Sequence, residues 1–127
     1  GWTASMPVLV RGGALLLMGL GIALTSWAMF VNAFFSGTVR IQRERGHDVV
    51  RDGPYRRVRH PGYVGGIVHH LAVSLVLGSL WGLIPGLLGA LALILRTALE
   101  DETLHQELAG YQAYAQQVPY RLLPGVW

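Results

Sequence analysis

The fold is organised around residues 51–66, which read RDGPYRRVRHPGYVGG. This stretch holds the densest cluster of cationic and polar ring-bearing side chains, and long apolar segments flank it on both sides. A polar block between such segments costs free energy unless it lies at a membrane surface or lines a site. Charge alone favours the simpler interpretation, a positive flank that orients the next membrane helix.

The overall composition is that of a membrane protein. The chain has 127 residues, of which 52% are hydrophobic and only 13% are charged. Soluble domains carry roughly 25% charged residues, and a soluble chain this small could not bury so much apolar surface. We therefore predict one integral membrane domain over residues 1–127.

The basic residues indicate which partners to expect. All ten are arginines, and seven of them fall between Arg40 and Arg59. Because this cluster lies between apolar segments, contact with anionic lipid headgroups on the cytoplasmic side is favoured over nucleic acid. The absence of cysteine excludes disulfides, a thiolate nucleophile and thiolate metal sites.

The first apolar segment covers residues 12–35, with no charge between Arg11 and Arg40. As a helix it would be about 36 Å long, enough to cross a bilayer core of roughly 30 Å. A signal peptide is the alternative, but residues 34–37 make a poor cleavage site. We predict an N-terminal membrane helix within residues 1–36. Its aromatic residues fit an interfacial belt, and Asn32 fits a satisfied interfacial amide.

The second apolar region, Val64–Leu95, would be about 48 Å long as one helix, which is too long for a single span. Residues 78–82 break it, and Pro85 fits the first turn of a following helix. We predict a hairpin over about 62–108, with arms at 62–78 and 83–108. The hairpin returns the chain to the side of the membrane that it left.

Helix-start chemistry precedes the hairpin. Pro61 pushes His60 out of the helical region and favours a helix start. The glycines at 62, 65 and 66 allow close backbone approach. A helix N-terminus beside Arg59 and His60 would suit a carboxylate or phosphate.

The returning arm brings a second polar group to the same membrane face. Arg96 and Glu100 are four residues apart and can pair on one helix face, and Asp101 follows. His69 and His70 lie inside the first arm, where ionisable residues are functional candidates. Adjacent residues point in different directions, so we expect no shared metal there, and their roles stay open.

The tail, residues 105–127, is amphipathic and then extended. Leu108, Tyr111, Tyr114 and Val118 recur at spacings of three to four and would rest on the membrane or on the hairpin. Pro119 ends the helix. The predicted fold class is therefore all-α: an integral membrane helical bundle of one N-terminal spanning helix, a helical hairpin and an amphipathic C-terminal helix.

Two spaced patterns carry a family resemblance. The first is His47-x2-Val50-x2-Gly53-x-Tyr55-x3-Arg59-His60-Pro61-x-Tyr63-x-Gly65, and the second begins Arg96-x3-Glu100-Asp101-x2-Leu104. Together they resemble the isoprenylcysteine carboxyl methyltransferase superfamily, which includes phospholipid methyltransferases. The resemblance covers residues 46–127, which we expect to form the cofactor-binding core.

The resemblance implies a membrane methyltransferase that uses S-adenosylmethionine, with its active site at the cytoplasmic face, in a prokaryotic inner membrane. Its implied catalytic residues are Arg59, Arg96 and Glu100, and no metal is implied. Its implied cofactor-binding residues are His47, Val50, Tyr55, His60, Pro61, Tyr63, Glu100 and Asp101.

The charges of these residues suggest which part of the cofactor or acceptor each would bind. The helix N-terminus after His60, aided by Arg59, would hold the cofactor's methionine carboxylate. Glu100 would bind its amino group or ribose hydroxyls, and Arg96 would orient an anionic acceptor or position Glu100. The expected acceptor is a lipophilic one, an isoprenoid-type carboxylate or thiol-linked acid, entering from the bilayer. The alternatives are N-methylation of a phospholipid or small amine, and a non-enzymatic membrane accessory role.

Overall fold

The computed structural model describes residues 6–127, and the predictions for residues 1–5 lie outside this range. Within it the regular elements are all helical, which confirms the predicted fold class. The α-helices are α1 (Val8–Val31), α2 (Pro61–Val76), α3 (Leu83–Glu107) and α4 (Tyr111–Gln117), and two short 3-10 helices, η1 (Arg43–Arg45) and η2 (Gly53–Arg56), lie between α1 and α2.

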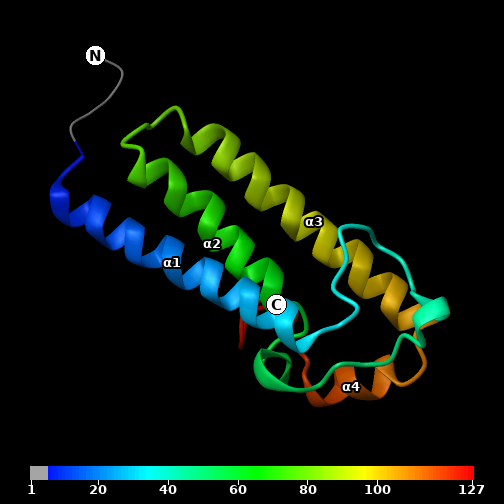
Figure 1. The fold of residues 1–127 in the computed structure, drawn as a ribbon. Coiled ribbons are helices and arrows are strands. Elements are labelled where there is room, and N and C mark those ends of the chain that lie inside the picture. The colour runs from blue at the N-terminus through cyan, green and yellow to red at the C-terminus, as the bar shows by residue number, and fades with distance from the viewer. Residues whose placement is uncertain (1–5) are drawn as a thin grey trace.

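The three long helices lie side by side, with α2 packed against both α1 and α3 (Figure 1). The short helix α4 lies across the end of this bundle. The connector from α1 to α2 extends beside the end of α3 before it returns through η2. The connector, α4 and the end of α3 therefore meet at one end of the molecule.

Small residues let α1 and α2 approach closely. A Cβ atom added to Gly21 would lie 2.7 Å from the Gly65 carbonyl oxygen. Thr25 on α1 also donates a hydrogen bond of 3.0 Å from its Oγ1 to the Gly62 carbonyl. The close approach expected for Gly62 and Gly65 is thus present, whereas a Cβ added to Gly19 would have no neighbour within 4 Å in the described part of the chain.

The hairpin agrees with its predicted arms to within two residues. After α2 the chain turns through Gly78, whose φ of +67° suits a residue without a side chain. The Ser74 hydroxyl donates to the Gly82 carbonyl at 2.6 Å, which closes the turn. Pro85 lies in the first turn of α3, where its missing N–H costs nothing.

The first membrane helix lies within its predicted range of 1–36, but it is shifted toward the N-terminus relative to the apolar run 12–35. It begins at Val8 and ends at Val31, because Asn32 takes an extended conformation and its Oδ1 accepts the Phe34 N–H at 2.9 Å. Trp27 and Phe30 are exposed as a belt requires, at 52% and 92%. Phe34 and Phe35, which we also expected in the belt, lie beyond the helix, where Phe34 stacks on His47.

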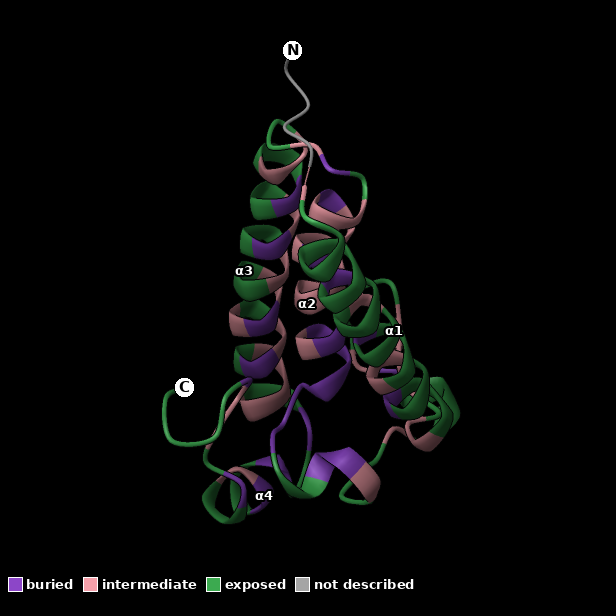
Figure 2. Cartoon of the chain, turned by 90° about the vertical axis from the view of Figure 1, so that its left-hand side faces the viewer, coloured by how far each residue is buried: buried purple, intermediate pink, exposed green. Residues whose placement is uncertain are grey.

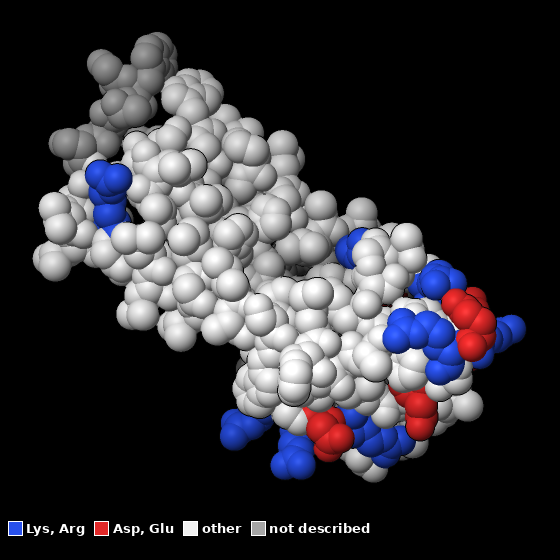
Figure 3. All heavy atoms as spheres, in the orientation of Figure 1, with Lys and Arg blue, Asp and Glu red and all other residues white. Residues whose placement is uncertain are grey.

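Two of the helices, α1 and α3, are long and apolar enough to cross a membrane. Their outward faces are exposed along most of their length, and the buried residues gather at the end near α4 (Figure 2). The acidic side chains and most basic ones visible in Figure 3 also gather at that end. The molecule therefore has an apolar helical body and a charged, well-packed end.

Candidate functional site

Asp101 on α3 is the centre of a buried polar network. Its side chain is 0% exposed. Arg59 donates to both carboxylate oxygens, from Nε to Oδ1 and from Nη2 to Oδ2, each at 2.9 Å. Arg121 donates to Oδ2 at 2.7 Å, and the Tyr111 hydroxyl donates to Oδ1 at 2.8 Å. His60 Nε2 lies 3.0 Å from Oδ1. We call these five residues the Asp101 hub.

The hub holds the C-terminal tail against the start of α2. The Nη1 of Arg59 donates to the carbonyls of Val118, at 3.0 Å, and Pro119, at 2.8 Å. The backbone N–H groups of Arg59 and His60 donate to residues 120 and 121 at 2.9 Å. Burial alone would lower the pKa of Arg59, but the hydrogen bonds and charge of Asp101 raise it. Charged Arg59 therefore links Asp101 on α3 to the C-terminal tail.

Because of these internal contacts, the structure does not support Arg59 and Asp101 as residues that contact a ligand. The Arg59 side chain already donates four hydrogen bonds within the protein, and the Asp101 side chain has no exposed surface. At the start of α2, the N–H groups of Tyr63 and Val64 both donate to the His60 carbonyl. The expected receptor for a cofactor carboxylate, formed by Arg59 and this helix start, is therefore largely satisfied internally.

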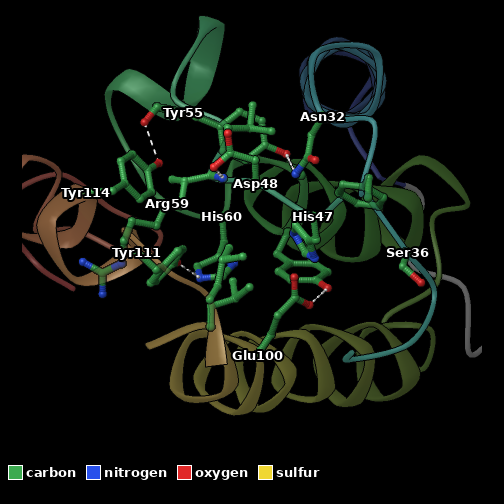
Figure 4. Close-up of a pocket in the computed structure, with 17 residues that line it drawn as sticks. Asn32, Ser36, His47, Asp48, Tyr55, Arg59, His60, Glu100, Tyr111 and Tyr114 are labelled. Atoms are coloured by element: carbon green, nitrogen blue, oxygen red, sulfur yellow. Dashed lines mark hydrogen bonds between the residues drawn. The ribbon is translucent and has the colours of Figure 1, made fainter. Parts of the chain in front are cut away.

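A pocket lies beside the hub, between the end of α1, the connector, the start of α2, α3 and α4 (Figure 4). It encloses about 530 Å³, including its open mouth. Of the eight expected cofactor residues, six line it and the other two, Pro61 and Asp101, do not. The lining residues are Asn32, Phe35, Ser36, His47, Asp48, Val49, Val50, Tyr55, Arg59, His60, Gly62, Tyr63, Glu100, Leu104, Leu108, Tyr111 and Tyr114.

Glu100 reaches into this pocket from α3, toward His47 (Figure 4). The Tyr63 hydroxyl donates a short hydrogen bond to Glu100 Oε2, and Arg96 Nε donates to the Tyr63 oxygen at 2.8 Å. Arg96 also donates to the Ser36 carbonyl at 3.0 Å. Because Oε2 is held from one side, the second oxygen of Glu100 can accept a donor from a bound molecule.

The imidazole of His47 is positioned as a hydrogen-bond donor to the pocket. Its Nδ1 lies 3.2 Å from the backbone N–H of Gln42, which can only donate, so the neutral ring carries its proton on Nε2. Phe34 stacks on the ring at 4.4 Å between centroids. Burial lowers the pKa of His47, which favours the neutral form.

The contacts of His60 also determine which ring nitrogen carries its proton. The proton of the Tyr111 hydroxyl already points to Asp101, so the bond between His60 Nε2 and the carboxylate requires the proton on Nε2. In the neutral ring, Nδ1 is then an acceptor. Tyr63 stacks beside this ring, with 5.9 Å between centroids.

Three buried tyrosines form part of the wall: Tyr55 was expected there from the sequence, whereas Tyr111 and Tyr114 were not. Tyr111 and Tyr114, which we expected to rest on the membrane or the hairpin, pack with Tyr55 in the core cluster at the polar end. The Tyr114 hydroxyl donates to the Tyr55 carbonyl at 2.7 Å. Burial raises the pKa of all three, to about 12 for Tyr55. All three are structural hydrogen-bond donors. The three-residue spacing of Tyr111 and Tyr114 was the signal available for those two.

Arg96 does not line the pocket but stands beside it, in an open groove along α3. The groove is otherwise apolar apart from His70, whose Nδ1–H donates to the Gly66 carbonyl at 2.8 Å. The neighbouring His69 has a buried Nδ1 atom with no hydrogen-bond partner among residues 6–127. Among residues 6–127, no group of three or more His, Asp or Glu side chains is arranged to hold a metal ion.

The fold and the pocket together define a small helical membrane protein with a polar site at one end of an apolar bundle. The sequence model of the phospholipid methyltransferase family matches residues 9–109. The chain therefore belongs to this family of membrane methyltransferases.

A curated relative is the Delta(14)-sterol reductase TM7SF2 of Mus musculus. It is 33% identical over 96 residues, which cover 72% of this chain and 23% of that protein. The chain thus spans about a quarter of the length of this relative, which by its name catalyses a reduction rather than a methyl transfer.

Proposed function

We propose that the protein is an S-adenosylmethionine-dependent methyltransferase that acts on a lipophilic acceptor at the cytoplasmic membrane face. One observation carries the proposal. A single pocket brings His47, His60 and Tyr63, from the first sequence pattern, together with Glu100 from the second. Family membership supports methyl transfer as the class of reaction.

The lining of the pocket fits such a cofactor. A few polar groups, among them Glu100, His47 and Asp48, stand among aromatic and aliphatic walls. A carboxylate suits an ammonium group, an N–H donor suits a hydroxyl or carboxylate oxygen, and apolar walls suit a purine ring.

When bound, S-adenosylmethionine supplies a methyl group on a positively charged sulfur. Glu100 would accept hydrogen bonds from its amino group, and His47 would donate from Nε2 to one of its oxygen atoms. Phe35, Leu104 and Leu108 exclude water from the reacting atoms, and the protein contributes mainly by positioning. Arg59 and Asp101 are structural in this proposal, because they hold His60 and the tail rather than the ligand.

The acceptor's apolar part lies in the groove that contains Arg96. This groove is open to the side of the bundle and lined mainly by aliphatic residues of α3. Arg96 also contacts Tyr63, a wall of the pocket, so an acidic group bound at Arg96 lies close to the cofactor site. An isoprenoid-type carboxylate or thiol-linked acid has this combination of an apolar chain and an acidic end.

A phospholipid amine is the second candidate acceptor, and it agrees with the description of the family. An amine must lose a proton to accept a methyl group. The Nδ1 acceptor of His60, with Asp101 behind the same ring, could take that proton.

Calorimetry in detergent tests the cofactor. We expect wild-type protein and Glu102→Gln to bind S-adenosylmethionine equally, because Glu102 is exposed and outside the pocket. We expect Glu100→Gln to lose most of the affinity. A titration with a reduced nicotinamide dinucleotide separates methyl transfer from the reductase chemistry of the relative. Binding of that dinucleotide alone, or of neither ligand to folded protein, would overturn the proposal, the second in favour of an accessory role.

A labelled-methyl assay then identifies the acceptor. A prenylated thioether carboxylic acid and phosphatidylethanolamine are offered in parallel to the same preparation. Label in the acid supports the first candidate, and label in the amine headgroup supports the second.

A further inference from the structure

A second concave surface lies on the other side of the segment that forms the pocket. It encloses about 1,350 Å³, including its open side. It shares no lining residue with the pocket, although both draw on residues 53–64. The residues that line it are Leu24, Trp27, Gly53, Pro54, Arg56, Arg57, Val58, Pro61, Val64, Leu122, Leu123 and Pro124. We call it the Arg56–Arg57 groove.

The groove combines an apolar wall with a cationic end. Leu24 on α1 and Val64 on α2 belong to the helical body, and Leu123 of the tail is 54% exposed. Arg56 and Arg57 are exposed at the polar end. Within residues 6–127 no carboxylate lies within salt-bridge distance of Arg57, and Arg56 has only Asp52 at 3.8 Å, with both side chains more than 70% exposed.

The surroundings decide which molecule fits this shape. The wall includes part of α1, a helix long enough to cross a bilayer, and the exposed Trp27, a residue typical of membrane–water interfaces. At that depth acyl chains are the available apolar partner. Two guanidinium groups above them attract a phosphate that carries net negative charge, whereas a zwitterionic headgroup gains little.

We propose that the Arg56–Arg57 groove is a binding site for one anionic phospholipid, with its acyl chains against Leu24, Val64 and Leu123 and its phosphate at the two arginines. This site goes beyond the proposed methyl transfer and does not depend on it. Because η2 also carries Tyr55 to the pocket, a lipid held here would brace that wall from outside.

Native mass spectrometry tests the charge selectivity. Wild-type protein in detergent is mixed with equal amounts of phosphatidylglycerol and phosphatidylcholine, and the retained lipid is identified. We expect phosphatidylglycerol to be preferred, and Arg56→Gln/Arg57→Gln to lower that preference about 30-fold, roughly fivefold for each arginine. The matched control, Arg43→Gln/Arg51→Gln, removes the same charge from exposed residues outside the groove and should keep the preference.

A second pair of variants tests the apolar half without changing charge. Leu123→Trp fills the groove and should reduce the retained phosphatidylglycerol several-fold. Leu87→Trp, at a similarly exposed position on α3, should not. Circular dichroism checks that each variant keeps its helices. Equal retention of both lipids by the wild type, equal loss in the two arginine pairs, or full retention in Leu123→Trp would each overturn the proposal.

Discussion

Glu100 and Asp101 are adjacent acids on one helix, yet the structure puts them in different environments. Asp101 is 0% exposed and its oxygens are occupied by the hub, whereas the Glu100 side chain is 27% exposed and lines the pocket. One residue of an α-helix turns the side chain by about 100°. Asp101 therefore stabilises the fold, while the neighbouring Glu100 is available to a ligand.

The two arginines of the sequence patterns divide in the same way. The Arg59 side chain is 6% exposed and donates to Asp101 and to two carbonyls of the tail. The Arg96 side chain is 28% exposed and contacts Tyr63 beside the pocket. Structural and ligand-facing polar groups are therefore interleaved along the sequence but separated in space.

The largest effect on stability is expected at Asp101. Asp101→Asn should leave the buried Arg59 without its carboxylate, and loss of one partner of a buried pair costs about 3–5 kcal/mol. The midpoint of thermal unfolding in detergent should then fall by roughly 10–20 °C. Circular dichroism at 222 nm follows the transition.

The control for this prediction is Glu102→Gln, one residue further along α3 and exposed. It should change the free energy of unfolding by no more than about 0.5 kcal/mol. A midpoint for Asp101→Asn that matches the control would show that the hub does not hold the fold together.

The next largest effect should appear in binding rather than stability. Glu100→Gln should weaken S-adenosylmethionine about 10- to 100-fold, because a hydrogen bond to a charged group is worth roughly 1.5–3 kcal/mol. Its unfolding midpoint should stay near that of the wild type. Calorimetry at constant pH gives the affinity, and an unchanged dissociation constant would remove Glu100 from the proposed site.

Tyr63→Phe should have a smaller effect, again on cofactor binding rather than on stability. It removes the hydroxyl that bridges Arg96 and Glu100 but keeps the ring that stacks beside His60. We expect about fivefold weaker cofactor binding, from the loss of roughly 1 kcal/mol of hydrogen bonding. An affinity equal to that of the wild type would mean that Glu100 needs no positioning partner.

The smallest effect should be the pH dependence due to His47. Burial holds its pKa below the ordinary value of 6.5, so the unfolded chain binds this proton more readily than the folded one. The stabilising contribution is complete above about pH 6.5 and is lost as the pH falls through the lowered pKa. His47→Gln should remove this part of the decline, roughly 2 °C or less in the midpoint.

Because His60 and His105 also adjoin Asp101, only the difference between wild type and His47→Gln isolates His47. Identical pH profiles for the two proteins would contradict the buried, neutral state of its ring.

Much of the fold was predictable because local chemistry sets it. The break at residues 78–82 defined the hairpin, and Pro61 placed His60 outside the helix, with φ at −128°. The end of α1 was not predictable, because an apolar run does not reveal that Asn32 will cap the Phe34 N–H and redirect the chain. Spacing could group His47, Tyr63 and Glu100 but could not show which of them face one another.

The hub was outside the reach of sequence patterns for a different reason. The partners of Arg59 include the backbone carbonyls of residues 118 and 119. Every residue has a backbone carbonyl, so the sequence does not reveal these partners. Which of two adjacent acids turns inward depends on how α3 rotates against the tail, a property of tertiary packing. The resemblance assigned both acids to the cofactor, whereas in the structure Glu100 lines the pocket and Asp101 is buried beside it.

The most direct test measures the shift in the thermal unfolding midpoint caused by saturating S-adenosylmethionine. This one measurement reports both on the stability of the fold and on binding in the pocket. A ligand at 100 times its dissociation constant adds about 2.7 kcal/mol of stability. We predict that wild-type protein and Glu102→Gln rise together, and that Glu100→Gln unfolds at the wild-type midpoint without ligand but hardly rises with it. A full shift in Glu100→Gln, or none in the wild type, would contradict the assignment of this pocket to the methyl donor.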